Sequence, residues 1–137
     1  MNIFVDEGCF KPVKAHDEDA GYDLRTPSNQ IVPAHESAVI DTGVHFEIPK
    51  GYYGKLESKS GLNVNHGVVC LGGVIDSGYT GSVMVKLYNL SDYDYIFSKG
   101  DKVVQIIFLR HISPEMVLVD KFKETNRGNN GFGSSGK

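Results

Sequence analysis

Residues 103–109, Val-Val-Gln-Ile-Ile-Phe-Leu, decide the fold of this chain. All but one of them are apolar, and most are β-branched residues, which pack well on a pleated sheet. A short apolar run of this kind is typical of a strand that is buried on both faces. The exception is Gln105, whose side chain needs a hydrogen-bond partner if it is buried: a phosphate, an ordered water or a neighbouring strand.

The segments around this run also favour strands. Apolar and polar residues alternate at 44–48 and at 82–88, and 116–119 is a further short strand candidate. Glycine, proline, asparagine and aspartate separate these segments at short intervals, which is typical of an antiparallel sandwich or barrel. No long amphipathic helix is evident, and only 60–67 is suited to one short helical turn. The sequence therefore predicts an all-β protein.

Bulk composition limits the classes of protein that this chain can be. Its 137 residues suffice for one domain, and a net charge of −3 gives no basic excess for a nucleic-acid polymer. Cys9 and Cys70 have no metal-like spacing, so reduced thiols are the simpler interpretation, although one disulfide stays open. The start of the chain is acidic, unlike a signal peptide, and no apolar run has membrane-spanning length. We therefore expect a protein of the cytoplasm, or of the host cytoplasm if the gene is viral.

The C-terminal residues 127–137 are rich in glycine, serine and asparagine. They divide the sequence into a β-barrel domain at 1–126 and an arm that buries little and is expected to be flexible. Glycine permits backbone N–H groups to converge on an anion, Arg127 is able to pair with phosphate oxygens, and Phe132 is able to stack on a base. A plain linker end is the competing interpretation.

Three further segments carry groups suited to phosphate chemistry. Residues 58–62, Ser-Lys-Ser-Gly-Leu, place a cation, a hydroxyl and a glycine where they can meet one phosphate, although a polar turn would look the same. In 72–81, Asp76 lies between apolar residues and a glycine-rich turn. This position suits a general base, but an aspartate that caps a backbone N–H in an ordinary turn would look the same. In 20–24, a second carboxylate is suited to magnesium or its waters, or to capping a turn.

In this order and spacing, these segments closely resemble the trimeric deoxyuridine triphosphate pyrophosphatase (dUTPase) family. The resemblance implies a distorted β-barrel of jelly-roll type, assembled as a homotrimer with shared active sites. It also implies hydrolysis of dUTP to dUMP and pyrophosphate with Mg²⁺, which keeps uracil out of DNA and supplies dUMP for thymidylate synthesis. Five segments carry the resemblance: AGYDL at 20–24, SKSGL at 58–62, GVIDSGYTG at 73–81, GDKVVQIIF at 100–108 and TNRGNNGFGSSG at 125–136.

The resemblance assigns roles to residues on the base and sugar side. Asp76 would deprotonate the water that attacks the α-phosphate, and it would contact the 3′-hydroxyl. Tyr79 would pack on the sugar and leave no room for a 2′-hydroxyl, and Asp23 would hold the magnesium ion through water. A hairpin at 69–75 would read uracil and exclude a 5-methyl group through its backbone, at three residues: Gly73, Val74 and Ile75.

The resemblance also assigns residues to the phosphates. Four of them would face the phosphate chain: Lys59, Ser60, Gly61 and Gln105. Phe132 of a neighbouring subunit would cover the uracil ring. Four residues of that same arm would grip the outer phosphates: Arg127, Gly133, Ser134 and Ser135.

Some positions depart from the family pattern. Lys59 stands where arginine is usual and lacks its bidentate fork, which predicts a weaker phosphate contact. Four milder departures retain the proposed base and stacking ring: Gly78, Thr80, Asn130 and Ser135.

Two other functions remain open at this point. The first is a dCTP deaminase, which shares the fold but uses a glutamate where this chain has Asp76, and the phenylalanine-bearing arm argues against it. The second is a nucleotide-gated protein that binds a regulatory partner, and no large insertion in this sequence indicates such a partner.

Overall fold

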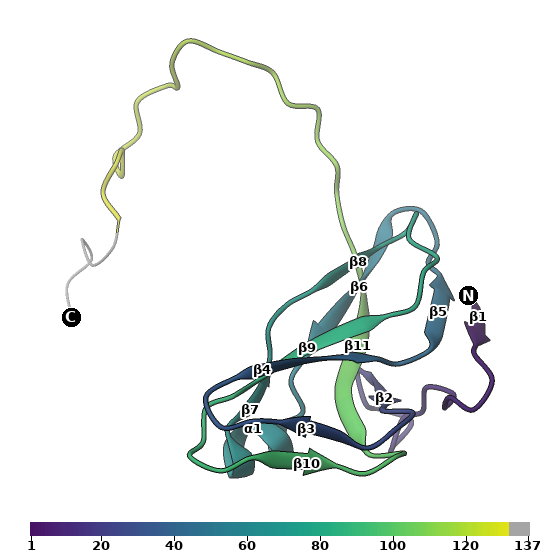
Figure 1. Cartoon of the computed structure of the whole chain (residues 1–137). Helices are drawn as coiled ribbons and strands as arrows, with labels where there is room; N and C mark the ends of the chain where they lie inside the picture. The colour runs from purple at the N-terminus through teal and green to yellow at the C-terminus, as the bar shows by residue number, and fades with distance from the viewer. Residues whose placement is uncertain (132–137) are drawn as a thin grey trace.

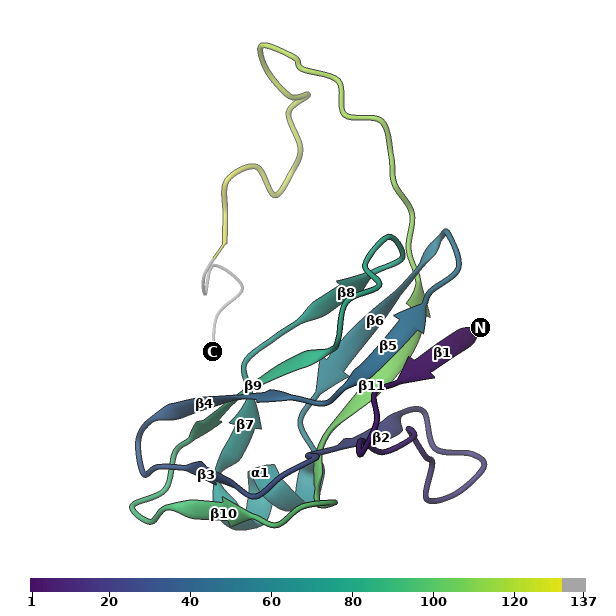
Figure 2. The same cartoon turned by 45° about the vertical axis from the view of Figure 1, so that its right-hand side comes forward.

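The computed structural model describes residues 1–131, and this part of the chain is almost entirely β-structure (Figures 1 and 2). All strand pairs are antiparallel, in two larger sheets of order β2-β11-β6-β8 and β4-β9-β7 and two small ones, β1-β5 and β10-β3. The strands are β1 (Asn2–Val5), β2 (Tyr22–Arg25), β3 (Gln30–Val32), β4 (Ser37–Asp41), β5 (Val44–Glu47), β6 (Tyr52–Glu57), β7 (Val68–Cys70), β8 (Val74–Asp76), β9 (Met84–Asn89), β10 (Tyr95–Phe97) and β11 (Lys102–Arg110). The predicted all-β class is confirmed.

Strand β11 is the predicted strand of 103–109, and it lies between β2 and β6. Its first half is fully buried at Val103, Val104 and Ile106, whereas its end emerges from the core. The half-buried side chain of Gln105 donates to the carbonyl oxygen of Ser58 at 3.2 Å, so its partner lies at the end of the neighbouring strand β6. Both larger sheets contribute to one apolar core, as in a distorted jelly-roll barrel.

Two predictions about local structure need correction. The segment 116–119 forms no strand, and its apolar side chains are exposed, because it pairs with no strand of residues 1–131. Strands β7 and β8 on either side of the turn at 71–73 do not pair with each other, because β7 pairs with β9 and β8 with β6. The predicted hairpin at 69–75 is therefore a crossing between two sheets.

The predicted helical turn is the helix α1 (Ser60–His66), which ends at Gly67 in the left-handed conformation with φ of 67°. After β11 the described chain has no further helix or strand and runs away from the barrel in both views (Figures 1 and 2). The described residues include no helix with the length and apolar character needed to cross a bilayer.

Candidate active site

A buried carboxylate with two lysines forms the first part of the site, which we call the Asp23 cluster: Ser58, Lys59, Lys102, Gln105 and Asp23 itself. Asp23, on β2, is only 5% exposed. Its Oδ1 accepts a hydrogen bond from Lys59, and its Oδ2 lies 2.7 Å from Nζ of Lys102. Burial of Asp23 by itself raises the pKa of its carboxyl, but the hydrogen bonds and charges of the two lysines outweigh this effect and hold the pKa below its ordinary value.

Strand pairing and helix entry bring this cluster together. On β11, Gln105 is in register with Asp23 of β2 on one side and with Glu57 of β6 on the other. Lys59 caps the start of α1 directly after β6, and Ser60 and Gly61 follow it at the exposed first turn of the helix. A β-carbon on Gly61 would meet nothing within 4 Å. Lysine ammonium groups and a hydroxyl at an open helix start are groups suited to an anion.

Gly21 shows why the segment AGYDL requires glycine. A β-carbon at this position would lie 2.5 Å from Oε1 of Gln105, so the glutamine side chain packs directly on the glycine backbone. The two segments 20–24 and 100–108, far apart in the sequence, are thereby fitted to each other. Sequence reasoning did not identify this contact, or Lys102 as a partner of Asp23, because both depend on the register between β2 and β11.

The second part of the site is the Asp76 loop, residues 76–82, which joins β8 to β9. Asp76 is the last residue of β8 and its side chain is exposed. Among residues 1–131 no hydrogen bond or ion pair of the Asp76 carboxylate is found. The Tyr79 hydroxyl donates to the carbonyl oxygen of Ser82 at 2.8 Å, and a β-carbon on Gly81 would lie 2.5 Å from that hydroxyl oxygen. The Tyr79 ring can therefore lie here only because residue 81 has no side chain.

The turn before β8 supplies backbone groups beside this loop. The carbonyl oxygen of Gly73 accepts from the N–H of Leu56 at 3.0 Å, and Val74 is 61% exposed. Ile75, by contrast, packs against the core. Because β8 is the outer strand of its sheet, one edge of its backbone has no neighbouring strand in the described chain. Such an edge offers N–H and C=O groups to a ligand.

Cys70 lies at the start of the same crossing. Its S–H donates to the carbonyl oxygen of Gly72 at 2.7 Å, and its N–H donates to Oγ of Ser58 at 2.8 Å. Burial, with a smaller contribution from Glu57, raises the pKa of the Cys70 thiol to about 11. Cys70 and Cys9 are both free, as the sequence indicated.

The Asp23 cluster and Asp76 share the outer face of one sheet but lie apart on it. Asp76 is in register with Tyr53 of β6, and Gln105 is in register with Glu57 of the same strand. Four residues of strand correspond to about 13 Å. The described chain therefore does not bring the predicted base and the predicted phosphate ligands together.

Of the predicted site residues in the arm, the structure describes only Arg127. Arg127 makes a local hydrogen bond, from Nε to the carbonyl oxygen of Asn130 at 3.1 Å. The other predicted arm residues lie outside the described residues: Phe132, Gly133, Ser134 and Ser135.

The donor set around Asp23 bears on the implied magnesium ion. Residues 1–131 contain no group of three metal-ligating His, Cys, Asp or Glu side chains. One carboxylate beside an anion-binding turn fits an ion that keeps its waters and is held largely by substrate phosphates, which is how Mg²⁺ is usually bound. It does not fit a cage built from protein ligands alone.

Fold and site together define a class of protein, namely a β-barrel that places a lysine-bound buried carboxylate and an exposed carboxylate without a partner among residues 1–131 on one sheet face. The comparisons with known proteins give the family. A family model described as dUTPase matches residues 11–136, and the chain belongs to the dUTPase family.

Relatives and solved structures agree. The chain is 37% identical over 130 residues to the deoxyuridine 5′-triphosphate nucleotidohydrolase of Paramecium bursaria Chlorella virus 1, with 95% of this chain and 92% of that protein covered. It is 40% identical over 127 residues to the enzyme of the same name from Kluyveromyces lactis, covering 92% and 86%. The Staphylococcus bacteriophage 80alpha dUTPase with dUPNHPP matches with a TM-score of 0.91 at 29% identity, over 99% of this chain and 98% of that one.

A second solved structure includes a metal. A mutant dUTPase from phage phi11 of S. aureus, described with a coordinated structural Mg(II) ion, matches with a TM-score of 0.81 at 28% identity. The match covers 88% of this chain and 97% of that one.

Proposed function

We propose that this chain hydrolyses dUTP to dUMP and pyrophosphate, and thereby keeps uracil out of DNA and supplies dUMP for thymidylate synthesis. The observation that carries the proposal is the family match, which spans residues 11–136 and so includes every strand except β1 and nearly all of the arm. The exposed carboxylate of Asp76 supports it, because a general base must be able to reach a water.

In the proposed reaction, a carboxylate oxygen of Asp76 orients a water molecule and takes its proton. The water oxygen then forms a bond to the α-phosphorus, and the bond from that phosphorus to the bridging oxygen breaks, so that pyrophosphate leaves. Positioning and electrostatics contribute most to reactions of this kind. Asp76 is suited to the role because no lysine or arginine of the described residues neutralises its carboxylate.

Selectivity for deoxyuridine would come from the residues around Asp76. The free edge of β8 would read uracil at Gly73, Val74 and Ile75. The ring of Tyr79, fixed by the contact of its hydroxyl with Ser82, would pack on the sugar and exclude a 2′-hydroxyl.

The phosphates would bind at the Asp23 cluster. Lys59 lies beside Asp23 and would turn to the phosphates, while Ser60 and Gly61 would contribute a hydroxyl and a backbone N–H, and Gln105 would lie beside them. Asp23 would hold magnesium through a water molecule. When bound, this ion neutralises phosphate charge and orients phosphate oxygens.

We also propose a homotrimer with shared active sites. The separation of Asp76 from the Asp23 cluster supports it, because one triphosphate site then needs these two parts from different subunits. The chain after β11 supports it too, since several large apolar side chains there are exposed and have no cover within the described chain: Ile112, Met116, Val117, Leu118 and Phe122. We propose the cytoplasm as its compartment, which suits two free thiols.

The arm at 127–137 would complete the site of a neighbouring subunit. Arg127 would contact the outer phosphates together with three other residues: Gly133, Ser134 and Ser135. Phe132 would cover the uracil ring. Burying a charged substrate under such an arm excludes water and strengthens its contacts.

The deciding experiment measures pyrophosphate release from dUTP, dTTP, dCTP and UTP, with Mg²⁺ and with a chelator. We expect magnesium-dependent turnover of dUTP, and much slower turnover of the other three. A chain truncated after Asn126 tests the arm: it should keep the size and unfolding midpoint of the full-length protein and lose most of its turnover. Equal turnover of all four nucleotides would refute the specificity, and ammonia released from dCTP would indicate a deaminase.

A further inference from the structure

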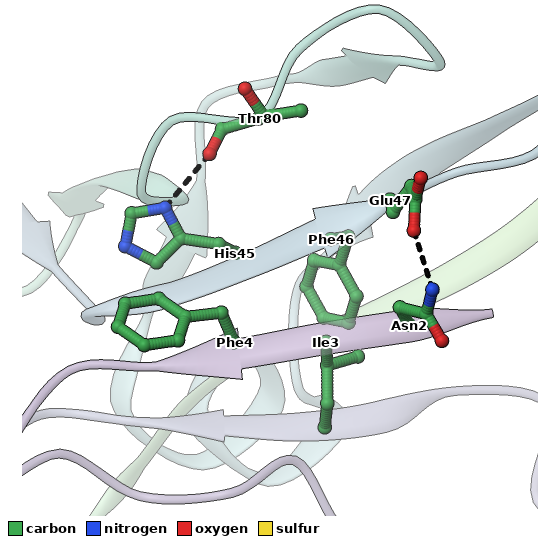
Figure 3. A pocket seen from close by; sticks show the side chains of 7 residues that line it. All are labelled: Asn2, Ile3, Phe4, His45, Phe46, Glu47 and Thr80. Carbon is green, nitrogen blue, oxygen red and sulfur yellow. Dashed lines mark hydrogen bonds between the residues drawn. The ribbon is translucent and has the colours of Figure 1, made fainter.

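A histidine on strand β5 contacts the Asp76 loop. Nδ1 of His45, on β5, lies 2.8 Å from the carbonyl oxygen of Thr80 (Figure 3). Within residues 1–131, this is the only hydrogen bond that joins 77–81 to a residue outside the Asp76 loop. The two others made by this segment stay inside the loop, from the N–H and the hydroxyl of Tyr79. The placement of the loop therefore depends on His45.

Both ring nitrogens of His45 face hydrogen-bond acceptors. A carbonyl oxygen only accepts, so Nδ1 must donate to Thr80. Nε2 lies 3.4 Å from the carboxylate of Asp6, which is also an acceptor. The protonated ring satisfies both contacts, whereas the neutral ring satisfies only one of them. The hydrogen bond to Thr80 raises the pKa of His45 above its ordinary value, and Asp6 and Asp41 add to this increase against the opposing effect of burial.

The surroundings of His45 connect it to other elements. Its ring packs against that of Phe4 on β1, with centroids 5.3 Å apart, at the edge of a cavity of about 280 Å³ (Figure 3). The charged groups that act on it are Asp6, after β1, and Asp41, on β4. Glu47 lies further along β5 and is bonded instead to the side chain of Asn2.

Asp41 anchors the far end of the same loop. Its Oδ1 accepts hydrogen bonds from the hydroxyl of Ser82 and, at 3.0 Å, from the N–H of Gly43. Asp41 thus fixes the loop at Ser82, where it enters β9, while the only hydrogen bond from the tip to a residue outside the loop, within the described chain, is the one to His45. A substitution of His45 should therefore let the tip move while Ser82 stays bound to Asp41.

We propose that His45 is a positioning residue, which sets the place of Asp76 and Tyr79 by holding the loop that contains them. Protonated His45 donates to Thr80 and to Asp6 at the same time. The neutral ring has a single N–H, for which the Thr80 carbonyl and the Asp6 carboxylate compete, so the neutral ring with its proton on Nε2 no longer donates to the loop. The loop is therefore held firmly below the pKa of His45 and less firmly above it. The catalytic consequence rests on the proposed function, whereas the loop contact does not.

The first test compares pH profiles of kcat/KM for dUTP between about pH 5.5 and pH 9, where a histidine titrates. For His45→Gln we expect roughly a fivefold to tenfold loss at the acidic end, as for one lost hydrogen bond of ordinary strength, and no alkaline step. Asp6→Asn retains the ring but removes the charge that favours its protonation, so the step should move to lower pH. The matched control is His35→Gln, whose histidine pairs with Asp92 at 2.8 Å on another loop.

The second test uses NMR on the protein without nucleotide. The ring signals of His45 give its pKa, and the amide signals of 79–81 should titrate with that same pKa and lose the transition in His45→Gln. If these amides do not follow His45, or if the kinetic step is unchanged in both variants, the proposal is wrong. If the wild type fails to hydrolyse dUTP, the proposed function is wrong, and the NMR titration alone then decides whether His45 holds the loop.

Discussion

The Asp23 cluster and the Asp76 loop lie on the same sheet face and differ in how their carboxylates are held. Asp23 is buried and has a lysine on each oxygen, with Gln105 packed beside it on Gly21. Asp76 is exposed, and no partner of its carboxylate is found among residues 1–131.

The difference follows from the cost of burying charge. A buried carboxylate is costly unless it is paired and hydrogen-bonded, and Asp23 is held in a fixed position by two lysines of its own chain. An exposed carboxylate remains hydrated at little cost, and it stays available to accept a proton. We infer that the chain preorganises the charge-neutralising part of its site and leaves the proton-accepting part free until substrate and a neighbouring subunit complete it.

Asp76→Asn removes the exposed carboxylate and should have the largest effect of the variants considered. The amide keeps the shape of the side chain but cannot take a proton, so kcat for dUTP should fall roughly 10²- to 10⁴-fold, the range for a positioned base. KM should change little, and the free energy of unfolding should stay within about 0.5 kcal/mol, because the carboxylate has no hydrogen bond or ion pair to lose among residues 1–131. Steady-state kinetics and urea unfolding measure both.

The control for this variant is Asp92→Asn, an exposed aspartate beside His35 that has no role in the proposed site. Its kcat should match that of the wild type. A kcat for Asp76→Asn within tenfold of the wild type would mean that another group accepts the proton.

Much of the fold is predictable from periodicity alone. The run at 103–109 and the alternation at 44–48 and 82–88 all correspond to strands. In each case the spacing of the apolar residues matches a strand that is buried on one face or on both. The same reasoning fails at 116–119, where a strand pattern has no partner strand within the chain. The apolar pattern indicates that a segment is suited to a strand, but the segment forms one only if its backbone pairs with the edge of another strand.

The site is predictable to a lesser degree. Motifs identify Asp23, Lys59 and Asp76 as candidates, but their partners depend on strand register. Lys102 reaches Asp23 only because β11 lies beside β2, and His45 reaches the Asp76 loop only because β5 lies beside its end. The one local signal for His45 is a polar residue within an alternating strand, which is common to many surface positions.

Lys102→Met tests how much the lysines around the buried carboxylate of Asp23 contribute to stability. It leaves one oxygen of Asp23 without its lysine, and we expect a loss of about 1–2 kcal/mol in the free energy of unfolding, less than for a fully buried pair because Lys102 is itself partly exposed. The matched control is Lys55→Met on the same sheet face, whose pair with Glu57 is exposed and should contribute little to stability. Urea unfolding at neutral pH measures both, and equal losses would mean that the Asp23 cluster is no more stabilising than a surface pair.

Gly21→Ala tests the packing inside the Asp23 cluster and should have the smallest effect. The new β-carbon would lie 2.5 Å from Oε1 and 3.0 Å from Cβ of Gln105. The flexible end of that side chain can move aside at the cost of its hydrogen bond to Ser58, whereas the contact with Cβ requires a shift of a few tenths of an ångström between β2 and β11. We expect a loss of about 1 kcal/mol in the free energy of unfolding, the typical value of one such bond. In Gly78→Ala, where a β-carbon meets nothing within 4 Å, stability should change by less than about 0.5 kcal/mol. If both variants were equally stable, Gln105 would have a second acceptable position, and the Asp23 cluster would be less rigid than its contacts indicate.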